Sequence, residues 1–202
     1  MIFKFVKLVV RSIFHILYDI EFIGIDKLPE KGAFIICANH ISIMDPILLV
    51  AFVRRNVRFM AKHELYKIPL LGSILTAAGA FPVNRESVEI TSIKHALGLL
   101  KNGEVMGIFA QGGRVASEVD EDSGKAGVAM FAVRASAPVV PIGIKGNYRP
   151  FTRIVINIGE PMYFQEEEGK KMRSAELSVL TKQIMAEMKK LADTNSRLKP
   201  TI

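Results

Sequence analysis

The sequence predicts a single α/β domain with a central, mostly parallel or mixed sheet flanked by helices, preceded by an amphipathic helix. Short apolar runs of strand length alternate along the chain with segments of helical periodicity. The 202 residues suffice for one domain with a substantial core. Because no internal repeat or Gly/Ser-rich linker divides them, we expect residues 1–22 to form the leading helix and residues 23–202 the domain.

The composition excludes several classes of protein. Half of the residues are hydrophobic and the mean hydropathy is +0.26, which excludes a disordered chain. One cysteine, Cys37, excludes a disulfide scaffold and a cysteine-rich zinc module, and it fits a reducing compartment. The net charge of +7 favours a negatively charged partner, either nucleic acid or a membrane surface.

The first element, residues 1–20, combines 14 apolar residues with a narrow polar stripe. Lys4, Lys7 and Arg11 lie on that stripe, where they would suit anionic lipid headgroups. The run is too interrupted for a membrane span and lacks the features of a signal peptide. We therefore predict a helix lying in the interface of a membrane phospholipid surface; the alternative is a helix whose wide apolar face packs on its own domain.

The first half of the remaining chain predicts strands and helices in turn. The apolar run 34–37 predicts a buried strand, and Asp45-Pro46 before six apolar residues is typical of an N-cap with proline in the first helical turn. Apolar residues in 88–101 recur every three or four positions, on one helix face that Gly103 ends. Shorter segments predict strands at 57–60 and 80–83 and a helix at 70–78.

The second half continues the alternation. Apolar, β-branched runs predict strands at 105–109, 139–144 and 154–158. A helix is predicted at 128–136, and the apolar spacing between Leu177 and Leu191 predicts a last, long amphipathic helix.

The sharpest chemical feature is the segment Asn39–Pro46. His40 leaves a buried strand, and Asp45 follows five positions later at the start of a helix. A tight loop can place the carboxylate on one imidazole nitrogen, so that the other nitrogen can accept a proton from a substrate hydroxyl. The alternative is a loop histidine held by a nearby helix cap, without a catalytic role.

Basic residues and glycines follow other predicted strands. Arg85 comes after strand 80–83, and Gly112, Gly113 and Arg114 come after strand 105–109. Adjacent glycines can turn backbone N–H groups toward an anion, and arginine offers a two-pronged phosphate contact; Lys62 is a third candidate. Each could also be an ordinary surface residue or turn, but such loops tend to converge at one edge of an α/β sheet.

Four motifs in this order resemble the glycerolipid acyltransferases, most closely the bacterial 1-acyl-sn-glycerol-3-phosphate acyltransferases. The NHxSxxDP motif is Asn39–Pro46, and a GxxxVxR-like motif is Gly79–Arg85. The FPEGTR motif corresponds to Phe109–Arg114, and the VPIG motif is Val140–Gly143. Weaker matches are A-K-x-E-L at Ala61–Leu65 and P-x-x-G at Pro69–Gly72.

The resemblance implies transfer of a fatty acyl chain from acyl-carrier protein or coenzyme A to the sn-2 hydroxyl of lysophosphatidate, giving phosphatidate. It implies that His40 is the general base and that Asp45 orients it. It also implies that Arg85, Arg114, the Gly112-Gly113 backbone and, more weakly, Lys62 hold the phosphate of this lysophospholipid acceptor. Neither a metal nor a bound cofactor is implied, and the expected location is peripheral or monotopic on the cytoplasmic face of the cell membrane.

The third motif departs from the family pattern. Gln111 replaces a glutamate, Ala110 a proline and Gly113 a threonine. Glutamine keeps a hydrogen-bond acceptor and loses the charge, so Gln111 remains a candidate substrate-binding residue. The identity of the acceptor is therefore open: another lysolipid, a glycerol phosphate, or only anionic-lipid binding with weakened catalysis.

Two other functions can be weighed on single features. Cys37 lies near His40 in sequence, but its apolar surroundings predict a core residue rather than a nucleophile. Nucleic-acid binding would rest on one basic cluster, without an aromatic-rich strand motif or a DNA-binding signature. That cluster comprises Arg54, Arg55, Arg58, Lys62 and Lys67. We therefore expect no nucleic-acid partner.

Overall fold

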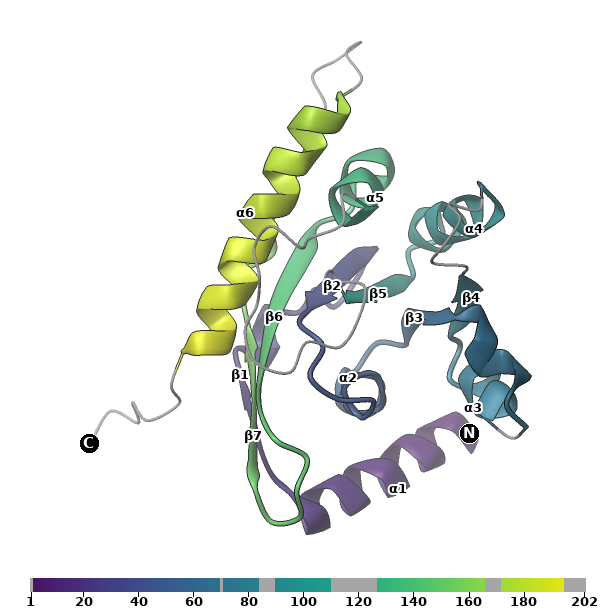
Figure 1. The fold of residues 1–202 in the computed structure, drawn as a ribbon, viewed down its shortest axis with the longest axis vertical. Coiled ribbons are helices and arrows are strands. Elements are labelled where there is room, and N and C mark those ends of the chain that lie inside the picture. The colour runs from purple at the N-terminus through teal and green to yellow at the C-terminus, as the bar shows by residue number, and fades with distance from the viewer. Residues whose placement is uncertain (1, 70, 84–89, 110–126, 166–171, 195–202) are drawn as a thin grey trace.

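A computed structural model describes residues 2–69, 71–83, 90–109, 127–165 and 172–194 (Figure 1). Its described strands form one seven-stranded sheet. The strands are β1 (Asp19–Ile23), β2 (Phe34–Ala38), β3 (Val57–Lys62), β4 (Phe81–Val83), β5 (Val105–Phe109), β6 (Val139–Gly146) and β7 (Arg153–Ile158). The helices are α1 (Ile2–Leu17), α2 (Asp45–Phe52), α3 (Leu71–Ala77), α4 (Ile90–Lys101), α5 (Gly127–Ala135) and α6 (Ser174–Asp193), with short 3₁₀ turns η1 (Ile25–Lys27) and η2 (His63–Lys67).

The sheet is mixed and mostly parallel, as predicted. Its strand order is β1-β7-β6-β2-β5-β3-β4. Strands β2 to β6 all run parallel, whereas β7 is antiparallel to β6 and pairs in parallel with β1. The carboxyl ends of five strands therefore lie on one edge of the sheet, which is where α/β proteins place their ligand-binding loops.

Helices cover both faces of the sheet, and β2 shows how one strand serves both. Phe34, Ile36 and Ala38 pack on the face covered by α1 and α2. Ile35 and Cys37 point to the other face, against α4, α5 and α6. All five are fully buried, and burying an isoleucine or phenylalanine side chain contributes about 1.5–3 kcal/mol. This fixes the register of β2, and therefore the point at which its chain emerges at the sheet edge.

The first helix is shorter than predicted, because α1 ends at Leu17. Residues 19–22, which we expected inside the leading helix 1–22, form β1 together with Ile23 at the edge of the sheet. Their partner strand is β7, and Ile20 of β1 pairs with Ile154 of β7. Local periodicity cannot reveal this pairing, since it depends on a strand more than 130 residues away.

The orientation of α1 differs from the expected one. Lys7 Nζ donates to the carbonyl oxygens of Val53 and Arg55, at 3.1 and 3.3 Å, and Arg11 donates to those of Ala51 and Phe52, at 2.5 and 3.2 Å. These carbonyls belong to the C-terminal end of α2 and the residues after it, where cations are favourable. Lys7 and Arg11 therefore hold α1 on the domain and do not point to lipid headgroups. Burial, assisted by the charge of Arg11, lowers the pKa of Lys7.

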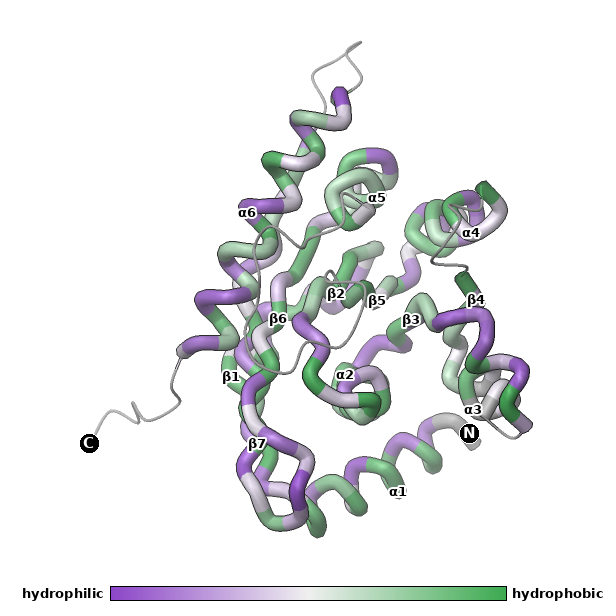
Figure 2. Tube along the Cα trace, in the orientation of Figure 1, coloured by the Kyte–Doolittle hydropathy of each residue, from purple (hydrophilic) through white to green (hydrophobic). Residues whose placement is uncertain are grey.

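The opposite side of α1 carries exposed apolar side chains. Figure 2 shows hydrophobic and hydrophilic residues alternating along this helix, which lies beneath α2 in Figure 1. Phe14 is buried in the core, whereas Leu8 and Ile16 are 60% and 70% exposed. Other large exposed residues of the helix are Phe5, Val6, Val9 and Ile13. Lys7 and Arg11 of the polar stripe thus face the protein, whereas Lys4 is exposed and most of the apolar face is uncovered.

The glycine of the VPIG motif has a packing role. At Gly143 in β6, a Cβ atom would overlap the backbone of Leu191 and Ala192 in α6. Only glycine allows this helix to lie directly on the strand. The motif therefore fixes the position of the last helix against the sheet.

Candidate active site

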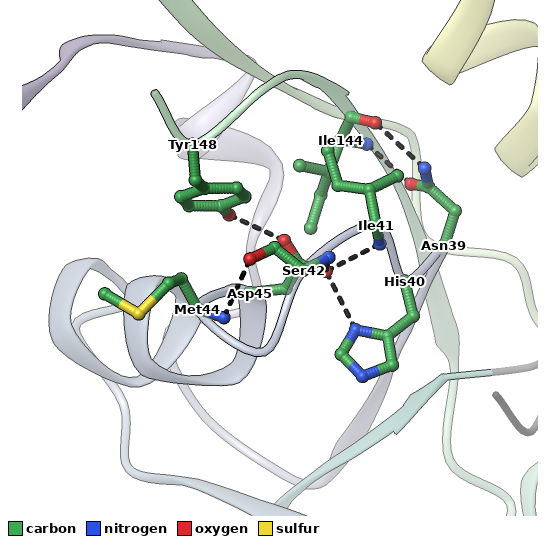
Figure 3. Close-up of polar contacts among 8 residues, drawn as sticks. All are labelled: Asn39, His40, Ile41, Ser42, Met44, Asp45, Ile144 and Tyr148. Atoms are coloured by element: carbon green, nitrogen blue, oxygen red, sulfur yellow. Dashed lines mark hydrogen bonds and ion pairs between the residues drawn. The ribbon is translucent and has the colours of Figure 1, made fainter. Parts of the chain in front are cut away.

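The loop that carries His40 is anchored by the residue before it. Asn39 follows β2 and is buried. Its Nδ2 donates to the carbonyl oxygen of Ile144 at 2.8 Å, and its Oδ1 accepts from the Ile144 N–H at 2.6 Å (Figure 3). The side chain thus continues the pairing of β2 with β6 for one more step. This fixes the chain direction where His40 leaves the sheet.

His40 and Asp45 are in direct contact, as the sequence predicted. His40 Nδ1 lies 2.8 Å from Asp45 Oδ2, and the side chains are 13% and 0% exposed. The same oxygen accepts from the N–H groups of Ile41 and Ser42, both at 2.7 Å. Three donors on one oxygen compensate the desolvation of the buried carboxylate.

Asp45 takes a different position from the predicted helix cap. It is the first residue of α2, and Met44 occupies the N-cap position without a capping bond from its side chain. The carboxylate of Asp45 turns back into the preceding loop. Pro46 is the second residue of the helix, in the first turn, where its nitrogen needs no hydrogen-bond partner. The loop is also tightened by Ser42 Oγ, which accepts from the Met44 N–H at 3.2 Å.

This geometry prepares His40 to act as a base. A carboxylate only accepts hydrogen bonds, so Nδ1 of His40 carries the proton that Asp45 receives. The lone pair of the neutral ring is then on Nε2, at the far side of the ring from Asp45 (Figure 3). When Nε2 accepts a proton, Asp45 stabilises the imidazolium. The pair can therefore abstract a proton from a hydroxyl group.

Phe109, the last residue of β5, supports the ring of His40. The two rings are stacked, with 4.1 Å between centroids and 18° between planes. Phe109 also stacks on Phe59 of β3, at 5.1 Å. Gly107 leaves the space for Phe59, because a Cβ atom at this position would overlap the Phe59 ring.

The family of the chain follows from its sequence. Residues 19–145 match the Acyltransferase family, and these residues are more than half of the chain. The chain belongs to this family.

Individual relatives and a solved structure agree with this assignment. The acyltransferase is 33% identical to a 1-acyl-sn-glycerol-3-phosphate acyltransferase of Bacillus subtilis over 71% of this chain and 71% of that protein. It is 27% identical to the enzyme of that name from Streptococcus pneumoniae, over 91% of this chain and 70% of that one. The crystal structure of PlsC, the 1-acyl-sn-glycerophosphate acyltransferase of Thermotoga maritima, aligns with a TM-score of 0.71 and 26% identity. That alignment covers 96% of this chain and 81% of PlsC.

Of the other site residues predicted for this acyltransferase, the structure describes only Lys62. It ends β3, and its ammonium group pairs with Glu64 at 3.3 Å on the surface. Arg85, Gln111, Gly112, Gly113 and Arg114 lie outside the described residues. Their preceding strands β4 and β5 end at Val83 and Phe109, on the edge that also carries His40.

Sequence reasoning missed Tyr148. Its hydroxyl donates to Asp45 Oδ1 at 2.6 Å (Figure 3). Burial, together with the negative charge of Asp45, raises the pKa of Tyr148 well above its ordinary value. The residue follows β6 at the same sheet edge as the other loops, so the rule that pointed to Arg85 and Arg114 would also have pointed to Tyr148.

Cys37 and much of the basic cluster have structural roles. Cys37 is fully buried in β2, and burial raises the pKa of its thiol from 9.0 to about 12. Arg55 donates to the carbonyl oxygens of Gly32 and Gly103, at 2.8 and 2.6 Å. Arg58 Nε pairs with Glu104 at 2.9 Å. These three side chains are therefore engaged within the protein.

The described residues contain no group of three or more His, Cys, Asp and Glu side chains arranged to hold a metal ion. None of the helices in this part of the chain has the length and hydrophobicity that crossing a bilayer requires.

Proposed function

We propose that this acyltransferase moves a fatty acyl chain from a thioester donor, acyl-acyl-carrier protein or acyl-coenzyme A, to the sn-2 hydroxyl of lysophosphatidate. The product is phosphatidate, a precursor in phospholipid biosynthesis. The observation that carries the proposal is the 2.8 Å contact between His40 and Asp45 in a chain of this family. The names of the relatives from Bacillus subtilis and Streptococcus pneumoniae support lysophosphatidate as the acceptor.

The proposed reaction is a direct transfer. Nε2 of His40 accepts the proton of the sn-2 hydroxyl as its oxygen attacks the thioester carbonyl carbon. Asp45 stabilises the imidazolium while the tetrahedral intermediate exists. The carbon–sulfur bond then breaks, and the imidazolium returns its proton to the leaving thiolate. One ester forms and one thioester is lost, and the proposed route includes no acyl-enzyme, metal or bound cofactor.

We assign the binding of the acceptor phosphate to the predicted basic residues. Arg85 and Arg114 would contact it as charged donors, with the Gly112-Gly113 backbone and Gln111 as neutral ones. Lys62 is the weaker candidate, because Glu64 already neutralises it on the surface. The support for these roles is their position in the family motifs and the common sheet edge at which β3, β4 and β5 end.

We assign the protein to the cytoplasmic face of the membrane as a peripheral or monotopic protein. The exposed apolar side of α1, with Leu8 and Ile16, supports this assignment, because such a face is stable when it lies in the acyl-chain boundary. Lysophosphatidate and its product are also membrane lipids. The thioester donor would approach from the aqueous side.

A different acceptor is the second candidate function. Gln111 and Gly113 replace the glutamate and threonine of the family motif, and both lie in the segment assigned to acceptor binding. Another lysolipid or a glycerol phosphate would use the same chemistry at His40. Loss of catalysis with retained anionic-lipid binding is the further alternative.

The test is acyl transfer to lysophosphatidate in detergent micelles, from both donors, with wild type beside His40→Ala and Asp45→Asn. We expect turnover by the wild type and a loss on the order of 10²–10⁴-fold in each variant. His95→Ala removes a histidine on α4 that packs on Phe81, and it should keep full turnover. An inactive but folded wild type would redirect the test to other lysolipids and glycerol 3-phosphate, and failure with all of these would leave binding alone.

A further inference from the structure

The carboxylate of Asp45 has two oxygen atoms with different partners. Oδ2 accepts from His40 and from the N–H groups of Ile41 and Ser42. Oδ1 accepts from the hydroxyl of Tyr148 at 2.6 Å. The partners of Oδ2 all come from one short loop, whereas Tyr148 comes from the connection between β6 and β7.

The chain between β6 and β7 is built to bring Tyr148 to Asp45. Gly146, at the end of β6, has a φ of 133°, and a Cβ atom there would lie 2.5 Å from the carbonyl oxygen of Arg153. Thr152 Oγ1 donates within this connection and lies 2.7 Å from the carbonyl oxygens of both Asn147 and Arg149. The Tyr148 ring packs edge-on against Tyr18, at 5.7 Å and 78°. The position of the Tyr148 hydroxyl is therefore fixed by its own loop and by Tyr18.

We propose that Tyr148 is a positioning residue for the His40–Asp45 pair, an inference that rests on the proposed function. Its hydroxyl holds Oδ1, so the carboxylate cannot turn about its Cβ–Cγ bond without losing all four hydrogen bonds. Oδ2 is thereby kept toward His40, and the Nδ1–H tautomer of the imidazole is maintained. The same bond takes up part of the carboxylate charge, which sets how strongly Asp45 attracts the proton of His40.

The hydroxyl is a permanent donor. Among the described residues, the charged or titratable groups that act on Tyr148 are Asp45 and Tyr18, and His40 lies beyond Asp45. Burial and the charge of Asp45 raise the pKa of Tyr148, so its hydroxyl keeps its proton near neutral pH. A change in the titration of His40 upon loss of this hydroxyl therefore reports the Tyr148–Asp45 bond.

The decisive variant is Tyr148→Phe, which removes the hydroxyl and keeps the ring. We expect kcat to fall about tenfold near neutral pH, with KM for both substrates unchanged, because a hydrogen bond to a charged group is worth about that factor. We expect the pKa of the His40 imidazolium, followed by ¹⁵N NMR, to rise by about one pH unit, because Asp45 then attracts the imidazole proton more strongly. The acidic limb of the pH profile of kcat/KM should shift to higher pH by the same amount.

Tyr163→Phe is the matched control. The Tyr163 side chain is 71% exposed and follows Met162, which pairs with Val139 at the start of β6, at the opposite end of that strand from Tyr148. This variant should leave kcat and the His40 titration unchanged. A second variant carries 3-fluorotyrosine at position 148, whose phenol is a stronger hydrogen-bond donor. It should shift the His40 pKa in the opposite direction, and it tests the proposal if Tyr148→Phe does not fold.

The outcomes separate the positioning role from the proposed function. An unchanged His40 titration in folded Tyr148→Phe, with or without a lower thermal stability, would overturn the positioning role. A wild type without acyl transfer would overturn the proposed function, while the NMR titration of His40 would still decide whether Tyr148 acts on the pair.

Discussion

The imidazole of His40 lies nearly parallel to the ring of Phe109, with 4.1 Å between the two ring centroids. The contact joins the loop after β2 to the last residue of β5, the two strands that pair at the centre of the sheet. Asp45 fixes the direction of one ring nitrogen, and the stack fixes the plane of the ring. Together these two constraints determine where Nε2 points, which neither constraint determines alone.

Phe109→Leu removes the flat partner of His40 while keeping an apolar side chain. Because an aromatic pair contributes about 0.5–1.5 kcal/mol, we expect kcat to fall roughly 3- to 10-fold with little change in KM. Steady-state kinetics with lysophosphatidate measure this. Phe22→Leu is the matched control, since Phe22 stacks on Phe52 and not on His40. Equal kcat values for Phe109→Leu and wild type would show that the stack has no catalytic effect.

The exposed side of α1 predicts which substitutions weaken membrane binding. Leu8→Gln combined with Ile16→Gln should reduce binding to vesicles of phosphatidylglycerol and phosphatidylcholine about 10-fold or more, since each buried side chain of this size contributes about 1.5–3 kcal/mol. Vesicle sedimentation measures the bound fraction. Val179→Gln changes an apolar residue of α6 that is also exposed, and it should bind like the wild type. Equal binding by the double variant would remove α1 from the membrane contact.

Much of the fold follows from local patterns in the sequence. The strand 105–109 has the predicted bounds, and the runs at 34–37, 57–60, 80–83, 139–144 and 154–158 each form a strand within two residues of the predicted ends. Buried strands of a mostly parallel sheet are apolar along their length, so they stand out without knowledge of their partners. The contact of His40 with Asp45 was also predictable, because five residues close a tight loop.

Several features that the sequence did not reveal depend on distant partners. β1 exists because β7 pairs with it, and Tyr148 acquires its role because it meets Asp45 across 103 residues. The sequence predicts that Lys7 and Arg11 face lipid, whereas in the structure they donate to carbonyl oxygens at and just after the end of α2. A helical pattern shows which residues share a face, but it cannot show which face the rest of the protein covers.

Cys37 predicts a specific pH dependence of stability. Burial raises the pKa of its thiol from 9.0 to about 12, so the unfolded chain loses this proton first. The stability due to the neutral thiol is fully present below pH 9.0 and is lost as the pH rises toward 12. Between about pH 8 and about pH 10.5, urea unfolding should therefore show a loss about 2 kcal/mol larger for wild type than for Cys37→Ala. A parallel pH dependence of the two proteins would contradict this.

The same variant tests the catalytic alternative for Cys37. Cys37→Ala should keep normal acyl transfer, because the thiol lies in the core of the sheet on the face of α4, α5 and α6. A thiol reagent should modify the native wild type only as fast as the core opens. Loss of turnover in folded Cys37→Ala would restore the nucleophile interpretation.

Asn39→Ala should lower both stability and activity, by one mechanism. The substitution leaves the N–H and carbonyl of Ile144 buried without their side-chain partner, which costs about 2–4 kcal/mol in the free energy of unfolding. It also releases the chain just before His40, so kcat should fall as well.

Asn157→Ala is the matched control, because the Asn157 amide donates to the carbonyl oxygen of Leu191 at 2.8 Å, at the end of α6. That variant should show a lower free energy of unfolding in urea. Its kcat, measured under conditions in which the variant is fully folded, should equal the wild-type value. If both asparagine variants lower kcat equally, the effect comes from general destabilisation, and Asn39 does not hold the His40 loop in its active position.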